Sequence, residues 1–153
     1  MTPNEIAAPA LATPPAQQAL STSIGTTEVL SVDLNGVSVL VVEDSWALAQ
    51  IQKVILEGAG VVVIGPAATI VDAEAFMATR VPDVAVLDIN LQGEMSYGLI
   101  ESLTELGIPV IVVTAYEVLP DLEKKVAAIL RKPFRANALL QSLRRVVDGL
   151  NAS

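Results

Sequence analysis

Acidic residues follow two apolar runs of this sequence, at the point where each run ends. VAVL (84–87) is apolar enough to form a buried strand, and Asp88 comes directly after it. VSVLVV (37–42) is followed in the same way by Glu43 and Asp44. A carboxylate beside a strand that is hidden from water is costly unless a partner neutralises it. These positions therefore predict a polar site.

Polar residues also follow two later apolar runs. VIVV (110–113) is followed by Thr114, and VAAIL (126–130) leads to Lys132. Ligands of an open parallel sheet bind beyond the carboxyl ends of its strands. We therefore expect one edge of a sheet to collect the following side chains: Glu43, Asp44, Asp88, Thr114 and Lys132.

The residue types in this set point to phosphoryl transfer. Three carboxylates would repel one another, and a hard divalent cation such as Mg²⁺ relieves that repulsion through oxygen ligands. A carboxylate can act as a nucleophile and form an aspartyl-phosphate, while Mg²⁺ draws charge from the transferring group. Lys132 would hold a phosphate oxygen as a point charge, and the Thr114 hydroxyl would donate to another.

Composition excludes several other classes of protein. The 153 residues carry a net charge of −8 and include no histidine or cysteine. Disulfides, zinc sites with Cys or His ligands, and Ser-His or Cys-His nucleophiles are therefore ruled out. The acidic balance argues against nucleic acid as a direct partner. No apolar run reaches the roughly 18 residues of a membrane span, and the N-terminus lacks a secretory signal, so we expect a cytoplasmic protein with no membrane insertion.

Five apolar runs alternate with stretches of helical spacing. The runs cover residues 37–42, 61–64, 84–87, 110–113 and 126–130. The second run is expected to end at Gly65-Pro66. Helices are expected over residues 70–79 and 97–106, and only a stub of helix fits between Thr114 and Ala127. Such alternation favours a parallel sheet with helices on both faces.

Two further helices have predicted inward faces. Leu48, Ile51 and Ile55 recur at helical spacing, and Gly58 and Gly60 end that helix. The last helix is expected to bury one side, made of Leu139, Leu143, Val146 and Leu150.

The first 35 residues differ from the rest of the chain. They are rich in Pro, Ala, Ser and Thr and contain no Lys or Arg. Such a segment buries too little apolar surface to offset its ordering entropy. We expect a flexible tail over residues 1–35, within which 28–32 could form an extra strand or docking segment, and one domain over residues 36–150.

Four motifs in this order resemble the receiver domain of two-component response regulators: VLVVED (39–44), AVLDIN (85–90), VIVVTA (110–115) and RKPF (131–134). The resemblance covers the chain from about Gly36 to Leu150. It implies a doubly wound, five-stranded parallel sheet of the flavodoxin or CheY-like kind, with strand order 2-1-3-4-5 and helices on both faces.

The same resemblance implies roles for individual residues. Asp88 would accept phosphate from a histidine kinase or histidine phosphotransfer protein, with Thr114 and Lys132 in the roles given above. Mg²⁺ would be bound by Glu43, Asp44 and Asp88, with the backbone carbonyl of Asn90 as a further ligand. The Lys132–Pro133 peptide bond would be cis, as the energetics of X-Pro bonds permit.

The sequence departs from typical receivers at one switch position. Ile129 stands three residues before Lys132, where such domains carry an aromatic residue. GPAAT (65–69), GEMSYG (93–98) and TAY (114–116) resemble a divergent alphaproteobacterial group of stand-alone receivers, sometimes called the FATGUY class. That group has a reduced fourth helix and an aromatic residue after the switch threonine, so Tyr116 would replace the missing ring; a plain surface aromatic is the alternative.

Other interpretations of single residues stay open at this point. Glu43 and Asp44 could cap the helix that starts near Ser45. Trp46 is expected to pack at the start of that helix, with a partner contact as the alternative. The Arg144-Arg145 pair is expected to be a solvated helix face.

The favoured function is a stand-alone phosphorelay receiver, a phosphoacceptor rather than a turnover enzyme. With no output domain expected after Ser153, it would signal through protein binding or phosphate relay. The alternative is a binding module on the same fold that needs no phosphate. A phosphatase with an aspartyl nucleophile would carry D-x-D-x-T after its first strand, which this sequence lacks. A flavin phosphate would be repelled by Glu43 and Asp44.

Overall fold

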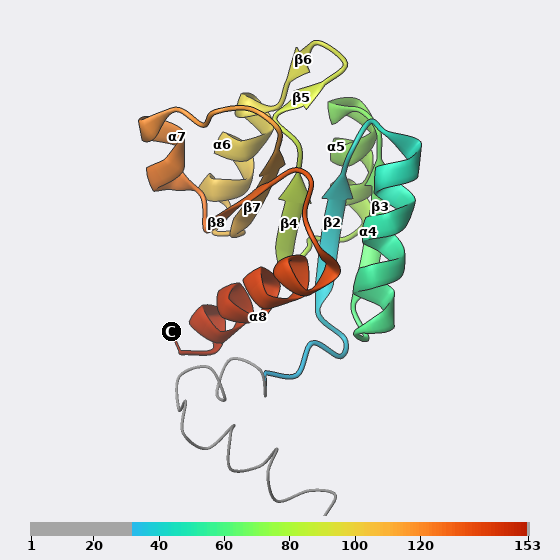
Figure 1. The fold of residues 1–153 in the computed structure, drawn as a ribbon. Helices are drawn as coiled ribbons and strands as arrows, with labels where there is room; N and C mark the ends of the chain where they lie inside the picture. The colour runs from blue at the N-terminus through green and yellow to red at the C-terminus, as the bar shows by residue number, and fades with distance from the viewer. Residues whose placement is uncertain (1–31, 153) are drawn as a thin grey trace, which may run out of the picture. The chain divides into compact units, whose positions relative to one another are not determined.

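All five apolar runs form strands of one parallel sheet (Figure 1). The computed structural model describes residues 32–152. The strands are β2 (Ser38–Val42), β3 (Val62–Ala67), β4 (Val84–Leu87), β7 (Val110–Thr114) and β8 (Ala128–Arg131). Their order in the sheet is β3-β2-β4-β7-β8, which confirms the predicted order 2-1-3-4-5.

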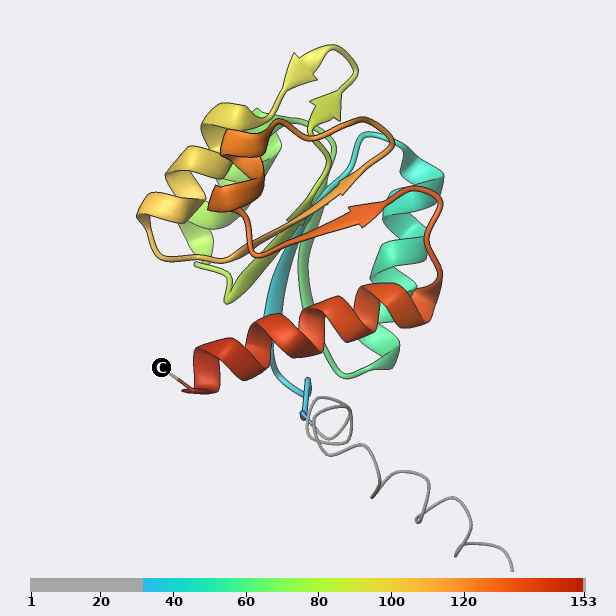
Figure 2. The same ribbon diagram turned by 60° about the vertical axis from the view of Figure 1, so that its left-hand side comes forward.

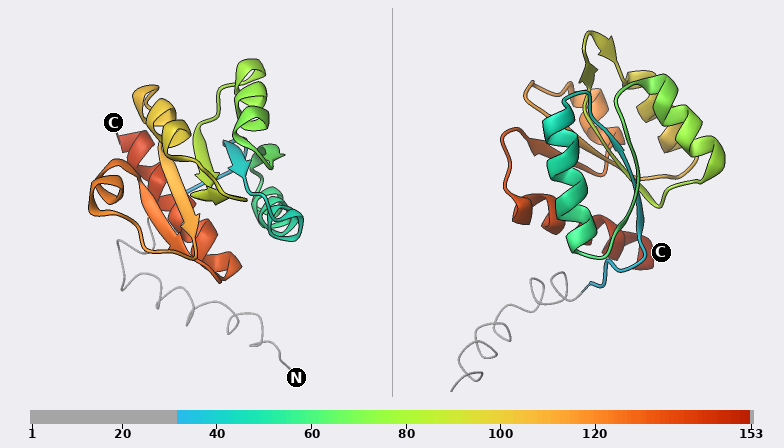
Figure 3. Two further views of the ribbon diagram at one scale, coloured as in Figure 1. Left: turned by 90° about the horizontal axis from the view of Figure 1, so that it is seen from above. Right: turned by 90° about the vertical axis from the view of Figure 1, so that its right-hand side faces the viewer.

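Helices connect these strands and cover both faces of the sheet. They are α4 (Trp46–Gly58), α5 (Ile70–Thr79), α6 (Tyr97–Glu105), α7 (Pro120–Lys125) and α8 (Ala136–Ala152). Helices α4 and α8 lie on one face, and α5, α6 and α7 lie on the other (Figures 2 and 3). The fourth of these helices, α7, has only six residues, so the expected short helix is confirmed. None of the helices in the described part of the chain is long and apolar enough to cross a membrane.

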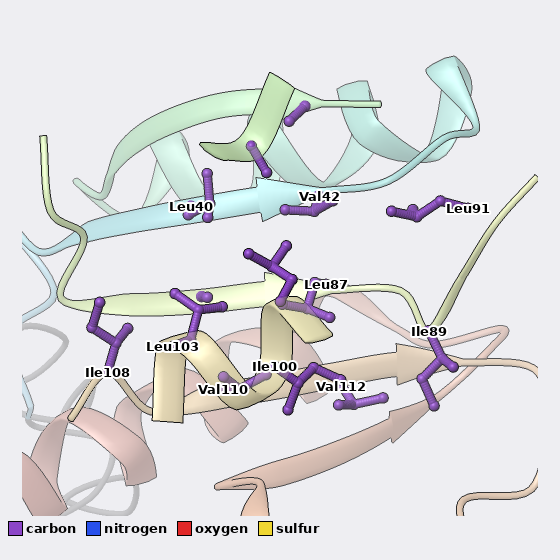
Figure 4. Close-up of a cluster of buried hydrophobic side chains, with 14 of the residues drawn as sticks. Leu40, Val42, Leu87, Ile89, Leu91, Ile100, Leu103, Ile108, Val110 and Val112 are labelled. Atoms are coloured by element: carbon purple, nitrogen blue, oxygen red, sulfur yellow. The ribbon is translucent and has the colours of Figure 1, made fainter. Parts of the chain in front are cut away.

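The main apolar core lies between the sheet and helices α5, α6 and α7. Leu40, Leu87 and Val112 project from three neighbouring strands and are fully buried. Ile100 and Leu103 of α6 pack onto them (Figure 4). Strands β2, β4 and β7 are buried along their whole length, as expected for a parallel sheet covered on both faces. This core fixes the positions at which the three central strands end.

The described residues just before Gly36 already contact the rest of the domain. Of the predicted tail, residues 1–31 lie outside the described residues, and so does almost all of the possible extra strand at 28–32. The compact unit starts at Asp33, where Leu34 is buried and the Gly36 N–H donates to the carbonyl of Gly60.

Helix α4 turns a different face inward from the one predicted. Its buried residues are Ala49, Gln52 and Leu56, whereas Ile51 is 50% exposed. On α8, the buried residues are Leu139, Leu143 and Val147, and Leu150 is exposed. The contacts of α4 with the sheet and with α8 determine which face of each helix is buried. The positions of the largest apolar residues in the sequence did not predict these buried faces.

Strand β3 does not end at Gly65-Pro66 as predicted but continues to Ala67. The Gly65–Pro66 bond is cis, and the pairing of β3 with β2 is irregular at this point. Proline is tolerated because β3 is an edge strand, where its missing N–H is not needed. Gly65 has a φ of +98°, and a Cβ there would lie 2.8 Å from the Ala67 nitrogen. The continuation matters for the site because the Ala67 carbonyl accepts the N–H of Glu43 at 2.9 Å.

A small hairpin that the sequence patterns did not reveal follows Asp88. It consists of β5 (Asn90–Leu91) and β6 (Glu94–Met95). Gln92 and Gly93 between them have φ values of 55° and 91°, which identifies a two-residue hairpin turn of the primed type. The Asn90 side chain closes this turn by accepting the Gly93 N–H at 2.7 Å.

Helix α6 ends at Glu105, and a Schellman motif at Gly107, the predicted stop, terminates it. The Ile108 N–H donates to the Leu103 carbonyl, and the Gly107 N–H donates to the Thr104 carbonyl. Gly107 has a φ of +77°, in the left-handed region that residues with a Cβ avoid.

We expect Gly107→Ala to destabilise the protein by about 1 kcal/mol, because alanine is strained at this φ. Gly98 is the matched control: it lies inside α6 with open space around its Cα. Gly98→Ala should stabilise by up to about 1 kcal/mol, through helix propensity. Urea unfolding of both variants measures the difference, and equal effects of the two substitutions would contradict the assignment.

Candidate functional site

Asp88 lies at the carboxyl end of β4, in the middle of the sheet. Its N–H donates to the Val42 carbonyl of β2, and its own carbonyl accepts the Ser96 hydroxyl at 2.7 Å. One carboxylate oxygen, Oδ1, accepts the Asn90 N–H at 3.3 Å, and the other, Oδ2, lies 2.7 Å from the Lys132 ammonium. The residue is only 6% exposed, so its carboxylate is held in a defined position with little access to water.

Glu43 is still more deeply buried, with 2% of its surface exposed. Its Oε1 lies 2.9 Å from the Lys132 ammonium, and its Oε2 accepts the Ser45 N–H at 3.1 Å. Burial raises the pKa of Glu43 above its ordinary value, even though Lys132 and the Ser45 N–H both favour the ionised form. The acid is therefore held in an environment that does not fully compensate its charge.

Asp44 completes a cluster of three acids. Glu43, Asp44 and Asp88 each offer a carboxylate oxygen, and these oxygens all lie within 4.8 Å of one another. The N-cap of α4 is Ser45, whose hydroxyl accepts the Leu48 N–H at 3.4 Å. The interpretation of Glu43 and Asp44 as helix caps is therefore wrong.

Lys132 brings the one cation of the described residues that lies within ion-pair distance of this cluster. Burial lowers the pKa of Lys132, but hydrogen bonds to Asp88 and Glu43 outweigh this effect and raise the pKa above its ordinary value. The Lys132 N–H donates to the Thr114 carbonyl at 2.9 Å, which ties the end of β8 to the end of β7. The Lys132–Pro133 bond is cis, as predicted.

Thr114 ends β7 and is fully buried. Its hydroxyl accepts the N–H of Tyr116 at 3.0 Å, which leaves the hydroxyl proton available for another acceptor. Tyr116 itself is 61% exposed. Arg131 donates to the Tyr116 carbonyl at 3.3 Å and pairs with Glu117 at 3.3 Å, so the loop after β7 is tied to the end of β8.

An open cavity of about 320 Å³ collects most of the predicted site residues. Asp44, Asp88, Asn90 and Lys132 line it together with Gln92, Gly93, Ala115 and Tyr116. Glu43 and Thr114 are not among the lining residues: Glu43 contacts the lining residue Lys132, and Thr114 directly precedes the lining residue Ala115 in the chain. The arrangement gathers oxygen ligands for a cation and one ammonium for an anion around the Asp88 carboxylate.

The comparison with protein families agrees with this geometry. A family model described as the response regulator receiver domain matches residues 39–144, which is more than half of the chain. The chain belongs to the response regulator receiver family.

Solved receiver structures share the fold. A CheY-like receiver domain protein from Methanospirillum hungatei is 27% identical with a TM-score of 0.70, and the match covers 77% of this chain and 98% of that one. The response regulator PhyR from Brucella abortus is 24% identical with a TM-score of 0.74, over 89% of this chain and 56% of that one. This receiver thus spans little more than half the length of that PhyR.

The receiver domain of PhyR from Erythrobacter litoralis is 24% identical with a TM-score of 0.68, over 74% of this chain and 92% of that one. At 24% identity, the two PhyR matches show only that the fold is shared. No curated protein sequence matches the chain.

Two features of this receiver were not anticipated from its sequence. Trp46 is 77% exposed, so the expectation that it packs at the start of α4 is wrong. Gln52 is a polar residue on the buried face of α4, and its amide lies 3.4 Å from Glu43. The signal that could have identified Gln52 is its spacing from Ala49 and Leu56, which share that face.

We expect Glu43→Gln to raise the melting temperature of the metal-free receiver near neutral pH. Because the folded-state pKa of Glu43 is raised, the folded protein holds this proton more tightly than the unfolded chain. The contribution of Glu43 to stability therefore falls as the pH rises above the ordinary value of 4.5. Glutamine has the same shape but does not ionise, so the gain should shrink toward acid pH.

Thermal melts in a chelating buffer between about pH 4 and pH 8 measure this effect. Glu57→Gln, on the exposed side of α4, is the matched control and should change little. A lower melting temperature for Glu43→Gln than for wild type at neutral pH would contradict the electrostatic account.

Proposed function

We propose that this receiver accepts a phosphoryl group on Asp88 from a histidine kinase or histidine phosphotransfer protein, in a reaction that requires Mg²⁺. The observation that supports the proposal is the contact of 2.7 Å between Lys132 and Asp88, which line one cavity together with Asp44. A buried nucleophilic carboxylate needs a cation to bring a charged phosphoryl group close, and this site offers one.

The donor set fits Mg²⁺. Three carboxylates offer oxygens within 4.8 Å of one another, and within residues 32–152 only one ammonium pairs with them. Glu43, Asp44, Asp88 and the backbone carbonyl of Asn90 would hold the ion, with water and phosphoryl oxygens as further ligands. The bound ion would supply positive charge against the phosphoryl oxygens during transfer.

The transfer itself uses one oxygen of the Asp88 carboxylate as the nucleophile. This oxygen forms a bond to phosphorus while the bond from phosphorus to the donor nitrogen breaks, and the electron pair of that bond leaves with the donor imidazole. Lys132, already within hydrogen-bond distance of Asp88, turns its ammonium to a phosphoryl oxygen. The Asn90 N–H holds the remaining carboxylate oxygen in place.

The added charge would then act on the end of β7. The Thr114 hydroxyl has a free proton to donate, and a phosphoryl oxygen on Asp88 offers an acceptor for it. Moving the hydroxyl weakens its bond to the Tyr116 N–H, so the loop that carries Tyr116 and Glu117 would shift. Arg131 opposes that shift by holding both residues in the described arrangement. Phosphorylation would thus change the population of two loop arrangements.

This chemistry describes a phosphoacceptor and not a turnover enzyme, because the product is the modified protein itself. We infer a cytoplasmic signalling protein that is read by a protein partner or passes its phosphate on. The short α7 and the exposed Tyr116 after Thr114 support placing it with the FATGUY-type receivers.

Incubation with acetyl phosphate and Mg²⁺ should add the mass of one phosphoryl group to the wild-type protein. The added mass should be absent with Asp88→Asn and with excess chelator, because the first removes the nucleophile and the second removes the cation. Intact-mass spectrometry at short times measures the adduct. An unchanged mass for wild type, or an equal adduct on Asp88→Asn, would overturn the proposed function.

A further inference from the structure

Gln52 is the one polar residue among the buried residues of α4. It is 1% exposed and lies between Ala49 and Leu56 on the inward face of the helix. Its Oε1 has no hydrogen-bond partner among the described residues, so its burial carries an energetic cost. Burial of this amide therefore calls for a compensating contact.

That contact is with the most buried acid of the site. The Gln52 Nε2 donates to Glu43 Oε1 at 3.4 Å, and the Lys132 ammonium lies 2.9 Å from the same oxygen. The other oxygen, Oε2, accepts the Ser45 N–H. Three groups thus restrain Glu43: Gln52 of α4, the Ser45 N–H before α4, and Lys132, which follows β8.

The restraint from Lys132 is the one that the proposed reaction would disturb. Lys132 is shared between Glu43 and Asp88 in the described state. A phosphoryl group on Asp88 would draw the ammonium toward its own oxygens and away from Glu43. Gln52 lies on a packed helix and has no such competing acceptor, so its amide would stay at Oε1.

We propose that Gln52 is a positioning residue for the metal site, because it holds the Glu43 carboxylate in place. Glu43 then stays a ligand of Mg²⁺ while Lys132 moves from Glu43 to the phosphoryl group. This inference rests on the proposed function and deepens it. Partners that lie behind metal ligands orient those ligands, and their loss commonly weakens metal binding.

Gln52→Met tests the proposal, because methionine has a similar length and volume but no donor. We expect the Mg²⁺ concentration for half-maximal phosphorylation by acetyl phosphate to rise roughly tenfold, the low end of the effect of such partners. The rate at saturating Mg²⁺ should stay near that of wild type. The melting temperature in chelator should stay within about 4 °C of wild type, since the substitution also removes an unpaired buried amide oxygen.

Leu56→Met is the matched control, one turn further along the same buried face. It should lower the melting temperature slightly and leave the Mg²⁺ dependence unchanged. If Gln52→Met proves unstable, Gln52→Leu supplies a second variant without a donor. A normal Mg²⁺ dependence for these variants, with or without a loss of stability, would assign Gln52 a purely structural role and overturn the proposal.

Titration calorimetry with MgCl₂ separates this inference from the proposed function. If wild type binds Mg²⁺ but takes no phosphoryl group, the proposed function fails, and the affinities of wild type and Gln52→Met still test the role of Gln52. If wild type is phosphorylated and both proteins bind Mg²⁺ equally, the function stands and the role of Gln52 is overturned.

Discussion

Three carboxylates share one ammonium at the carboxyl edge of this sheet, and that imbalance determines what the site can do. Lys132 contacts Glu43 and Asp88 directly, and Asp44 supplies the third acid of the cluster. Protein groups alone leave negative charge in a region with little access to water. Burial raises the pKa of Glu43 for this reason, despite its neighbours. A site in this condition favours added positive charge, which the proposed Mg²⁺ would supply.

An acid at the opposite edge of the sheet shows the contrast. Asp83, just before β4, accepts both the N–H and the hydroxyl of Ser38, and its own N–H donates to the Ser38 hydroxyl. The Asp83 carboxylate therefore has its hydrogen-bond partners in a single residue, Ser38. These bonds join the start of β2 to the residue before β4. Asp88 differs because one of its oxygens pairs with Lys132, which directly follows β8, the strand two positions from β4 in the sheet. Of these two acids, only Asp88 has a flexible side chain, that of Lys132, as a partner that could move to another acceptor.

The strands, and the proximity of the candidate site residues, could be predicted from the sequence because both depend on short, local patterns. Buried parallel strands appear as apolar runs, and their order follows from the receiver motifs. Because the carboxyl ends of parallel strands meet at one edge of the sheet, the sequence was enough to predict that four side chains lie close together: Glu43, Asp44, Asp88 and Lys132. The face of α4 could not be predicted in this way, since Ile51 lies outward and Gln52 inward for reasons of packing with other segments. The β5–β6 hairpin was missed because Gln92 is an unusual residue at a positive φ.

Under the proposed function, the contacts of Arg131 with Tyr116 and Glu117 would limit how a phosphorylation signal spreads from the end of β7. Ile129 stands where the resemblance to typical receivers implies an aromatic residue, and it packs against the core cluster. The exposed Tyr116 is instead connected to β8 through its carbonyl, and its N–H is connected to the Thr114 hydroxyl. A displacement of that hydroxyl would therefore act first on the backbone of the loop rather than on a ring that moves between core and surface. Under the proposed function, the hydrogen bonds that join the Tyr116 backbone to Thr114 and Arg131 would form the element with two states, in place of an aromatic rotamer change.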